Sequence, residues 1–297
     1  MPTANLEAPR NSTTDRTVPL TLRAIRLWFA VESRIAPGSA ENRAARMFAT
    51  PPSHKRSTRT NPETIGSDWV NIAIRDGSST VAASALGHGP TVMLIHGWGG
   101  SAKDMTALAI AFAKAGYRSI VFDMPGHGRS SGRESSLVEF LGAMRAVVRI
   151  FGTPDFLVGH SFGGSAAILG ITELALPVRG AVLVSPAPGP AYYVDRFART
   201  LGLPTARTHG MVKRLVERVG RTLESLDAVS AAQHARVPAL VFHDPADREV
   251  PFEFSRQMTD AWEGARLIEA PSLGHKRILR DPATIATAVD FVRSLSP

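Results

Sequence analysis

The sequence predicts an α/β fold in which a mostly parallel central sheet is covered by helices on both faces. From about residue 68 to the end, short apolar runs alternate with longer stretches of helical pattern, as expected when crossover helices join parallel strands. Several of these runs are apolar throughout, which is typical of strands that are buried on both faces. The 297 residues suffice for one such domain with a large core.

The first 67 residues differ in composition from the rest and are predicted to form a basic N-terminal extension of the α/β domain 68–297. Apolar positions within 19–36 suit a short amphipathic helix that is ended by a Pro-Gly pair. A second short helix is expected over 40–49, and a polar linker over 53–66.

Much of the net charge of +8 lies in this extension. The first 60 residues hold ten Lys and Arg against four Asp and Glu, which gives +6. A basic excess of this kind suits an anionic membrane surface or nucleic acid. We interpret it as a solvated arm, with contact to an anionic membrane surface or a partner as the alternative, and nucleic acid is not an expected partner. A further alternative is that its helix folds back onto the α/β domain and covers apolar surface.

The elements of the α/β domain can be placed in order. An alternating run, an Asp76-Gly77 hairpin signal and a return strand predict antiparallel pairing at one edge of the sheet. A Ser101-x-x-Asp104 pattern predicts a capped helix start. The strands are expected at 69–74, 80–86, 91–95, 118–122, 155–159, 180–184, 238–242 and 266–269, and the main helices at 101–115, 135–151 and 282–295.

One segment, about 188–235, is longer than a single crossover helix requires. We predict that it forms a small helical cap, inserted before the penultimate strand and lying over the strand ends. The alternative is an elongated crossover that packs away from those ends.

The composition excludes several classes of site and predicts a cytoplasmic protein. The chain has no cysteine, which excludes disulfides, thiolate metal sites and cysteine nucleophiles. No apolar run approaches the ~18–20 residues that span a bilayer, and no signal-peptide core is present. Histidines and carboxylates lack metal-binding spacing, and no P-loop or G-x-G-x-x-G occurs. We therefore expect neither a metal nor another cofactor.

The segment Gly159-His-Ser-Phe-Gly163 reads G-x-S-x-G between an apolar run and a run of small residues. A strand, a sharp turn and a helix in this order would expose the Ser161 hydroxyl at a helix N-terminus, where developing negative charge is favoured. The alternative is a glycine-rich connection with an incidental serine.

Polar residues follow the other strands, and ligands of an open α/β sheet bind at the carboxyl ends of its strands. Asp247 and His275 lie in two such loops and follow Ser161 in the order expected for a Ser-Asp-His triad. In this arrangement His275 is the base and Asp247 orients it. Asp244 is kept as the alternative acid.

The backbone N–H groups of Trp98 and Phe162 are the expected oxyanion donors, because the glycines around Trp98 allow its loop to approach a substrate closely. The side chain of His160 is expected to point away from Ser161. Other polar side chains of these loops are predicted to hold the loops together: His96, His127 and Asp123.

From about residue 68 to the end the chain resembles serine hydrolases of the α/β-hydrolase fold. Five segments match in order and spacing: His96–Gly100, Asp123–Ser130, Gly159–Gly164, Asp244–Pro251 and Gly274-His275. The resemblance implies the same nucleophile, acid, base and oxyanion loop. A serine nucleophile argues against the members that dehalogenate or open epoxides. His243-Asp244 departs from the small residues common at that point, and the extension 1–67 lies outside the resemblance.

The reaction expected from these residues is hydrolysis of a carboxylic ester or thioester through an acyl-enzyme on Ser161. The expected substrate is a small-molecule ester or thioester, small or medium in size, with an apolar portion. Substrate-binding residues are not predicted. The alternatives are carbon–carbon bond hydrolysis, peptidase or acyltransferase chemistry on the same triad, or a ligand-binding protein without catalysis.

Overall fold

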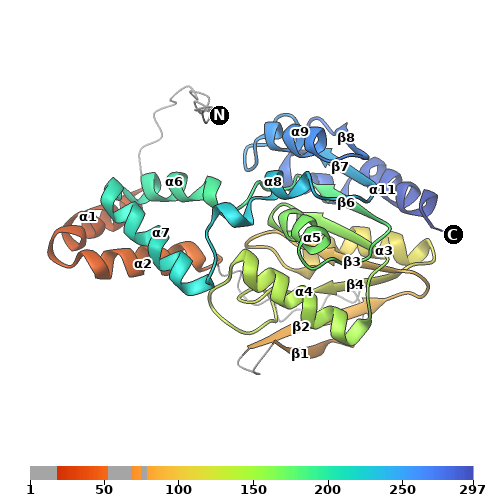
Figure 1. Ribbon diagram of the computed structural model, residues 1–297, viewed down its shortest axis with the longest axis horizontal. Helices are drawn as coiled ribbons and strands as arrows, with labels where there is room; N and C mark the ends of the chain where they lie inside the picture. Colours follow the sequence, from red (N-terminus) through yellow and green to blue (C-terminus); the bar gives the residue numbers. More distant parts are fainter. Residues whose placement is uncertain (1–18, 53–67, 75–78, 297) are drawn as a thin grey trace.

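The computed structural model describes residues 19–52, 68–74 and 79–296. Its centre is an eight-stranded sheet with the order β1-β2-β4-β3-β5-β6-β7-β8 (Figure 1). The strands are β1 (Val70–Ile74), β2 (Ser79–Leu86), β3 (Thr91–Ile95), β4 (Arg118–Phe122), β5 (Phe156–His160), β6 (Gly180–Val184), β7 (Ala239–His243) and β8 (Ala265–Glu269).

The pairing of the strands confirms the predicted fold class. β2 pairs antiparallel with both β1 and β4, whereas the other neighbours are parallel. The antiparallel pairs lie at one edge, as the sequence predicts. The Asp76-Gly77 turn signal lies outside the described residues, as do the segments 1–17 and 53–66.

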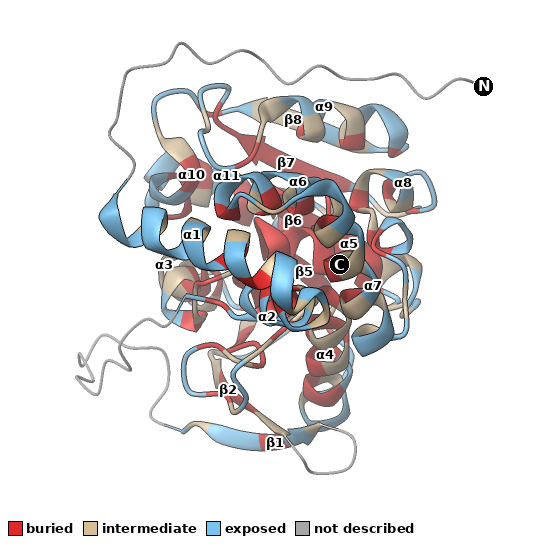
Figure 2. Ribbon diagram, turned by 90° about the vertical axis from the view of Figure 1, so that its left-hand side faces the viewer, coloured by how far each residue is buried: buried red, intermediate tan, exposed pale blue. Residues whose placement is uncertain are grey.

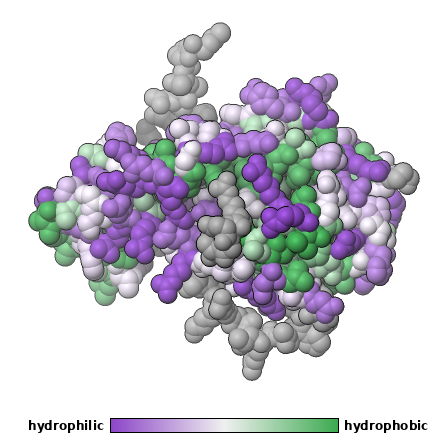
Figure 3. All heavy atoms as spheres, turned by 60° about the horizontal axis from the view of Figure 1, so that its bottom comes forward, coloured by the Kyte–Doolittle hydropathy of each residue, from purple (hydrophilic) through white to green (hydrophobic). Residues whose placement is uncertain are grey.

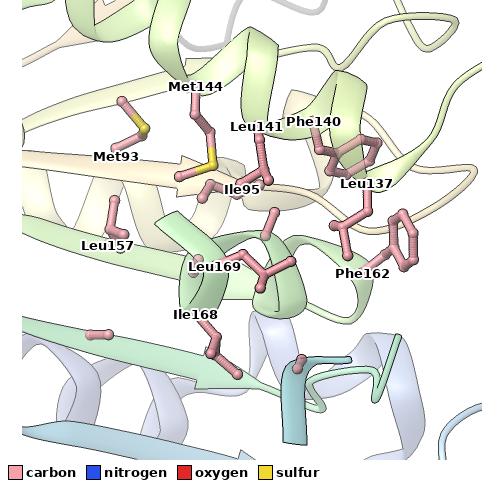
Figure 4. Close-up of a cluster of buried hydrophobic side chains, with 14 of the residues drawn as sticks. Met93, Ile95, Leu137, Phe140, Leu141, Met144, Leu157, Phe162, Ile168 and Leu169 are labelled. Carbon is pink, nitrogen blue, oxygen red and sulfur yellow. The ribbon is translucent and has the colours of Figure 1, made fainter. Parts of the chain in front are cut away.

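Alternation along the central strands divides the core into two layers. In β3, Met93 and Ile95 face one layer, and Val92 and Leu94 face the other. The first layer packs against α4 (Leu137–Phe151), α5 (Phe162–Thr172), α8 (Ala228–Ala232) and α9 (Phe252–Ala261), and the second against α3 (Thr106–Lys114) and α11 (Pro282–Ser294). Figure 4 shows the first layer, where side chains of β3 and β5 meet those of α4 and α5. The parallel strands β3 to β7 are therefore buried on both faces, in agreement with their apolar sequences, whereas β8 at the edge of the sheet is only partly buried.

Side chains at the helix starts explain where several helices begin. The capping box predicted at Ser101 is present, with Asp104 as its second partner, although the helix opens with a short 3-10 turn, η1 (Ala102–Met105). Ser136 caps α4 by accepting from the backbone N–H of Glu139. Asp281 caps α11 in the same way. These caps satisfy N–H groups that have no partner within the helix.

The insertion before the penultimate strand is present between β6 and β7. It consists of α6 (Pro190–Leu201), α7 (Thr205–Val219), a 3-10 turn η2 (Glu224–Leu226) and α8. α8 packs on α5 and α9 beside the sheet, whereas α6 and α7 project away from it (Figure 1).

The N-terminal segment forms a helical hairpin, α1 (Leu20–Ile35) and α2 (Pro37–Ala49). The sequence predicts only the end of a helix at Pro37, whereas in the structure Pro37 is the first residue of α2. Proline fits both positions, because it is also favoured in the first turn of a helix. The hairpin packs on α6 and α7 and shares a hydrophobic cluster with them. The expectation of a solvated arm is therefore wrong for residues 20–49. We call the unit formed by α1, α2, α6 and α7 the four-helix cap.

No helix within the described ranges is both long enough and apolar enough to cross a membrane. The two remaining short elements, α10 (Gly274–Arg277) and η3 (Ile278–Arg280), follow β8 and lead into α11.

Candidate active site

Ser161 occupies the sharp turn between β5 and α5. Its backbone has φ 52° and ψ −120°, a region that a residue with a side chain rarely adopts. The turn is possible because glycines flank it. A Cβ added to Gly159 would lie 2.5 Å from the carbonyl oxygen of Gly163, and one added to Gly163 would collide with the carbonyl oxygen of Ile95. The serine is therefore held in a strained conformation at the start of a helix, which is common at functional sites.

His275 and Asp247 form a buried pair on two neighbouring loops. Nδ1 of His275 lies 2.7 Å from Oδ2 of Asp247. The other carboxylate oxygen of Asp247 accepts from the backbone N–H groups of Glu249 at 2.7 Å and Val250 at 3.1 Å. Because the carboxylate accepts, Nδ1 of His275 carries the proton in the neutral ring, and Nε2 is left as the basic nitrogen.

The surroundings of Asp247 keep it ionised. Burial raises the pKa of this carboxyl group, but hydrogen bonds from His243 and His275 act in the opposite direction and leave the pKa below its usual value. A carboxylate in contact with His275 stabilises the imidazolium ion that forms when this ring accepts a proton.

His243 is a second partner of Asp247 to which the sequence reading assigned no role. It is buried, and its Nε2 lies 3.3 Å from Oδ2 of Asp247 and 3.1 Å from the carbonyl oxygen of Val250. Both neighbours of Nε2 are acceptors, so we assign the proton to Nε2, and the hydroxyl of Ser255 then donates to Nδ1 at 2.6 Å. The sequence carries no signal for this contact, because His243 ends β7 and Asp247 lies in the loop that follows, where residue spacing does not fix which side chains meet.

Asp244, the alternative acid, contacts backbone groups instead of His275. Its two oxygens accept from the N–H groups of Ala246 at 2.8 Å and Gly274 at 2.5 Å. It thereby joins the loop after β7 to the residue that precedes His275.

The loop after β3 is held by the side chains predicted to do so. Nε2 of His127 accepts from the N–H of Gly99 at 3.0 Å, and Nε2 of His96 accepts from the N–H of Met124 at 2.9 Å. Asp123 accepts from two further backbone N–H groups, those of Ala102 and Arg129. These structural roles are confirmed.

The same loop passes directly beside the serine. A Cβ added to Gly97 would lie 2.9 Å from Cβ of Ser161. The ring of Trp98 stands edge-on to that of Phe162, with centroids 5.6 Å apart. Within the described part of the chain, the backbone N–H groups of Trp98 and Phe162 donate no hydrogen bond to another protein group.

The expectation that the side chain of His160 points away from Ser161 is wrong, because His160 and Ser161 line the same cavity. The His160 ring is buried with its centroid 4.6 Å from that of His275, and its Nε2 lies 2.9 Å from the carbonyl oxygen of His275. Burial and the neighbouring His275 ring lower the pKa of His160 to about 3. The ring is therefore neutral at pH 7 and packs against the candidate base.

A cavity of about 760 Å³ lies between the sheet domain and the four-helix cap. Ser161 and His275 line it, together with Trp98 and Phe162, whereas Asp247 lies behind His275. The hairpin and the inserted helices supply most of the facing wall, with Met47, Phe48, Ala49, Pro52, Tyr193, Phe197, Leu215, Val219 and Leu223. The structure thus places Ser161, His275, Trp98 and Phe162 around one mostly apolar cavity. Residues of segment 47–52 also line this cavity, although the sequence analysis assigns them no part in the site.

Comparison with known proteins identifies relatives that match about 70% of this chain. A bifunctional esterase/perhydrolase from Acinetobacter calcoaceticus is 25% identical over 69% of this chain and 92% of that protein. A pimeloyl-[acyl-carrier protein] methyl ester esterase from Chromobacterium violaceum is 26% identical over 71% of this chain and 94% of that protein.

Solved structures show the same fold. Est1E from Butyrivibrio proteoclasticus, with ferulic acid bound, superposes with a TM-score of 0.62 at 21% identity, covering 76% of this chain and 98% of that one. A monoacylglycerol lipase from Paleococcus ferrophilus gives 0.59 at 25% identity, covering 73% and 99%. The model of the alpha/beta hydrolase family matches residues 92–288. Since this match spans most of the chain and every loop described above, the chain belongs to the alpha/beta hydrolase family and is a hydrolase.

Proposed function

We propose that this hydrolase cleaves carboxylic esters or thioesters through an acyl-enzyme on Ser161. The observation that carries the proposal is that one cavity is lined by a positive-φ serine and by His275, which is paired with Asp247 behind it. The esterases among the relatives support the same reaction class.

In the first half of the proposed reaction, the acyl group of the substrate is transferred to Ser161. Nε2 of His275 removes the proton of the Ser161 hydroxyl while Oγ bonds to the carbonyl carbon, and the carbonyl π electrons move to oxygen. The N–H groups of Trp98 and Phe162 stabilise this oxyanion. When the carbonyl re-forms, the bond to the leaving oxygen or sulfur breaks, and the leaving group takes the proton from His275.

In the second half, water releases the acid. His275 removes a proton from a water molecule whose oxygen attacks the acyl carbon, and the same proton then returns to Oγ of Ser161 as the acyl–serine bond breaks. Asp247 holds the imidazole ring in one orientation and stabilises its charged form in both halves.

The volume and the lining of the cavity favour a substrate whose acyl group carries an apolar chain of medium length. The cavity volume falls within the range of about 300–1,000 Å³ that is usual for small-molecule sites. The wall opposite Ser161 is formed largely by aliphatic and aromatic side chains of the four-helix cap. Such a wall stabilises an acyl chain by burying its surface.

Labelling with a fluorophosphonate, followed by peptide mass spectrometry, tests the nucleophile. We expect a stoichiometric adduct on Ser161 that is lost in Ser161→Ala and in His275→Ala. Ester turnover by Ser161→Ala should fall at least about 10⁴-fold. Ser185→Ala is the matched control, because Ser185 also has a positive φ at the end of a neighbouring strand and is buried, but it does not line the cavity.

Two results would contradict the proposal. One is the absence of an adduct on folded wild-type protein, which would favour a ligand-binding protein without catalysis. The other is undiminished labelling or turnover in Ser161→Ala. A panel of matched esters, thioesters and amides then separates ester hydrolysis from peptidase chemistry.

A further inference from the structure

We propose that the outer face of helix α1 docks the four-helix cap onto an anionic lipid surface. This docking is independent of the ester hydrolysis proposed above and is tested without reference to it.

The first observation is an exposed apolar stripe along α1. Its members are spaced by three or four residues and therefore share one side of the helix. The exposed fractions of its large side chains reach 81% for Leu20, 68% for Leu27 and 78% for Ile35. Figure 2 shows α1 running across the outside of the molecule with mostly exposed residues. The outer stripe consists of Leu20, Ala24, Leu27, Trp28, Val31 and Ile35.

Exposed apolar side chains are concentrated on α1. Six of the ten large apolar side chains that are exposed within the described residues belong to this helix. The opposite side of α1 is used in packing, since Phe29 is 2% exposed in the hydrophobic cluster of the cap. No α1 residue lines the cavity, so binding of the acyl substrate does not explain the stripe.

The second observation is the charge around the stripe. Helical spacing places Arg23 and Arg34 along one edge. Arg43 lies at the other edge, with its guanidinium 5.0 Å from the centroid of the Trp28 ring. The two carboxylates of the hairpin are already engaged, Glu32 with Arg43 and Glu41 with Arg207. Since Glu32 compensates the charge of Arg43, the net positive charge beside the stripe comes from Arg23 and Arg34.

The same sign extends over the whole four-helix cap. Residues 20–52 and 190–223 together carry twelve Lys and Arg against four Asp and Glu, so these segments hold a net charge of +8, equal to that of the entire chain. Figure 3 shows hydrophobic side chains reaching the surface at the outer end of the cap among hydrophilic ones. The sheet domain contributes no comparable excess.

An anionic bilayer is the occupant that matches both observations. A helix that lies in a membrane interface buries an apolar face with aromatic residues below the headgroups and keeps Lys and Arg among the phosphates. The stripe with Trp28, bordered on one side by Arg23 and Arg34, has this layered chemistry. The long stems of the arginines also add apolar contact at such a boundary.

Vesicle flotation with the full chain tests the proposal. We expect binding to phosphatidylcholine vesicles that contain about one third phosphatidylglycerol, little binding to phosphatidylcholine alone, and weakening by salt. Binding should shift tryptophan emission to shorter wavelength, and Trp28→Phe should remove this shift. Leu27→Glu/Val31→Glu should reduce the partition constant at least about tenfold.

Two further variants separate the apolar from the ionic contribution to vesicle binding. Arg23→Gln/Arg34→Gln should weaken binding to the anionic vesicles about tenfold. Ile150→Glu is the matched control, because Ile150 is an exposed apolar residue of α4, 56% accessible, on the sheet domain. It should bind like wild type. Circular dichroism and thermal unfolding establish that each variant is folded.

Three outcomes would overturn the proposal. These are absence of binding to anionic vesicles, equal binding by wild type and Leu27→Glu/Val31→Glu, and a concentration-dependent dimer without vesicle binding that this double variant abolishes. The last outcome, measured by light scattering, would assign the stripe to contact between copies of the chain. If the first outcome is accompanied by capture of an acidic protein, the stripe is assigned to a protein partner.

Discussion

Asp247 contacts two histidines, and only His275 lines the cavity. His243 stands behind the carboxylate, fixed in turn by Ser255. A hydrogen bond to a charged group contributes more than one between neutral groups, so this contact orients Asp247 as well as stabilising its charge.

We expect His243→Phe to lower kcat for ester hydrolysis about tenfold and to leave KM nearly unchanged. The ring fills the same space, but Asp247 loses one donor and is less firmly oriented towards His275. His234→Phe is the control, because His234 is exposed in the described structure. Steady-state kinetics of both variants decide the matter, and an unaltered kcat in His243→Phe would show that the contact has no positioning role.

His96 makes the free energy of unfolding depend on pH. Burial lowers its pKa from 6.5 to about 4, so the folded state leaves it neutral where the unfolded chain binds a proton. Stability therefore falls as the pH decreases from about 6.5 towards 4. From pH 7 to pH 5 the loss from His96 is about 2 kcal/mol.

Urea unfolding of wild type and His96→Gln at both pH values measures this contribution. The variant should show a smaller difference between pH 7 and pH 5, because glutamine does not titrate. His88→Gln serves as the control, since His88 is not among the buried residues. Equal pH dependence in wild type and His96→Gln would refute this account.

The loops that carry Ser161, Asp247 and His275 could be predicted because each follows a recognisable apolar run. The orientation of the His160 side chain could not be predicted. Alternation along a strand assigns neighbouring side chains to opposite faces, but the strand ends at His160, and the positive φ of Ser161 turns the next side chain. The contact of His243 with Asp247 depends on how the loop after β7 folds, which spacing alone does not determine.

At the scale of the elements, the loop after β3 must pass close to the turn that holds Ser161. Gly97→Ala should lower kcat/KM about 100-fold, because the added methyl group would lie 2.9 Å from Cβ of Ser161 and would displace the loop. Gly142→Ala is the matched control. Gly142 lies in α4 with nothing closer than 3.8 Å to an added Cβ, and alanine there should stabilise the fold by about 0.5–1 kcal/mol.

Kinetics and thermal unfolding of the two variants separate a local from a general effect. A displaced oxyanion loop predicts lost turnover with a small change in Tm for Gly97→Ala. If its kcat/KM equalled that of wild type, the loop would not need its close approach to the serine.

The strands of the sheet domain lie within one residue of the ranges predicted from the sequence, and in β3 to β7 burial on both faces leaves little choice of residue type. The helix boundaries were less predictable. Pro37 is compatible with both the end of one helix and the first turn of the next, and the backbone after Ala36 decides between them. The predicted helix at 101–115 begins as a 3-10 turn, a distinction that its capping box does not encode.

For the molecule as a whole, the least predictable feature was the packing of the N-terminal hairpin on α6 and α7, which are far from it in sequence. The charges of segment 20–49 suggested a solvated arm, yet Glu32 and Glu41 are paired, and small side chains of α2 (Ala40, Ala44 and Ala45) are buried in the cap. Close helix packing through alanines leaves only a weak hydrophobic signal in the sequence. The hairpin thereby reaches the cavity through Phe48.

Phe48 should help to select the acyl chain. Its ring meets that of Phe197 edge-on, with centroids 5.3 Å apart, at the wall of the cavity. We expect Phe48→Ala to lower kcat/KM about tenfold for an ester with a medium-length acyl chain and to leave an acetate ester nearly unaffected. Trp28→Ala is the control, because Trp28 belongs to the same hairpin and does not line the cavity. A uniform effect on all chain lengths would place Phe48 outside the acyl site.

The four-helix cap has a hydrophobic cluster of its own, separate from the two clusters that flank the sheet. A part of a protein with its own core can open as one cooperative unit, at a lower free energy than global unfolding. The cavity lies at the boundary between this unit and the sheet domain. Opening of the cap as a body would therefore widen the route to Ser161 while the strands that position the serine stay intact, so that access and catalytic geometry are governed by different parts of the chain.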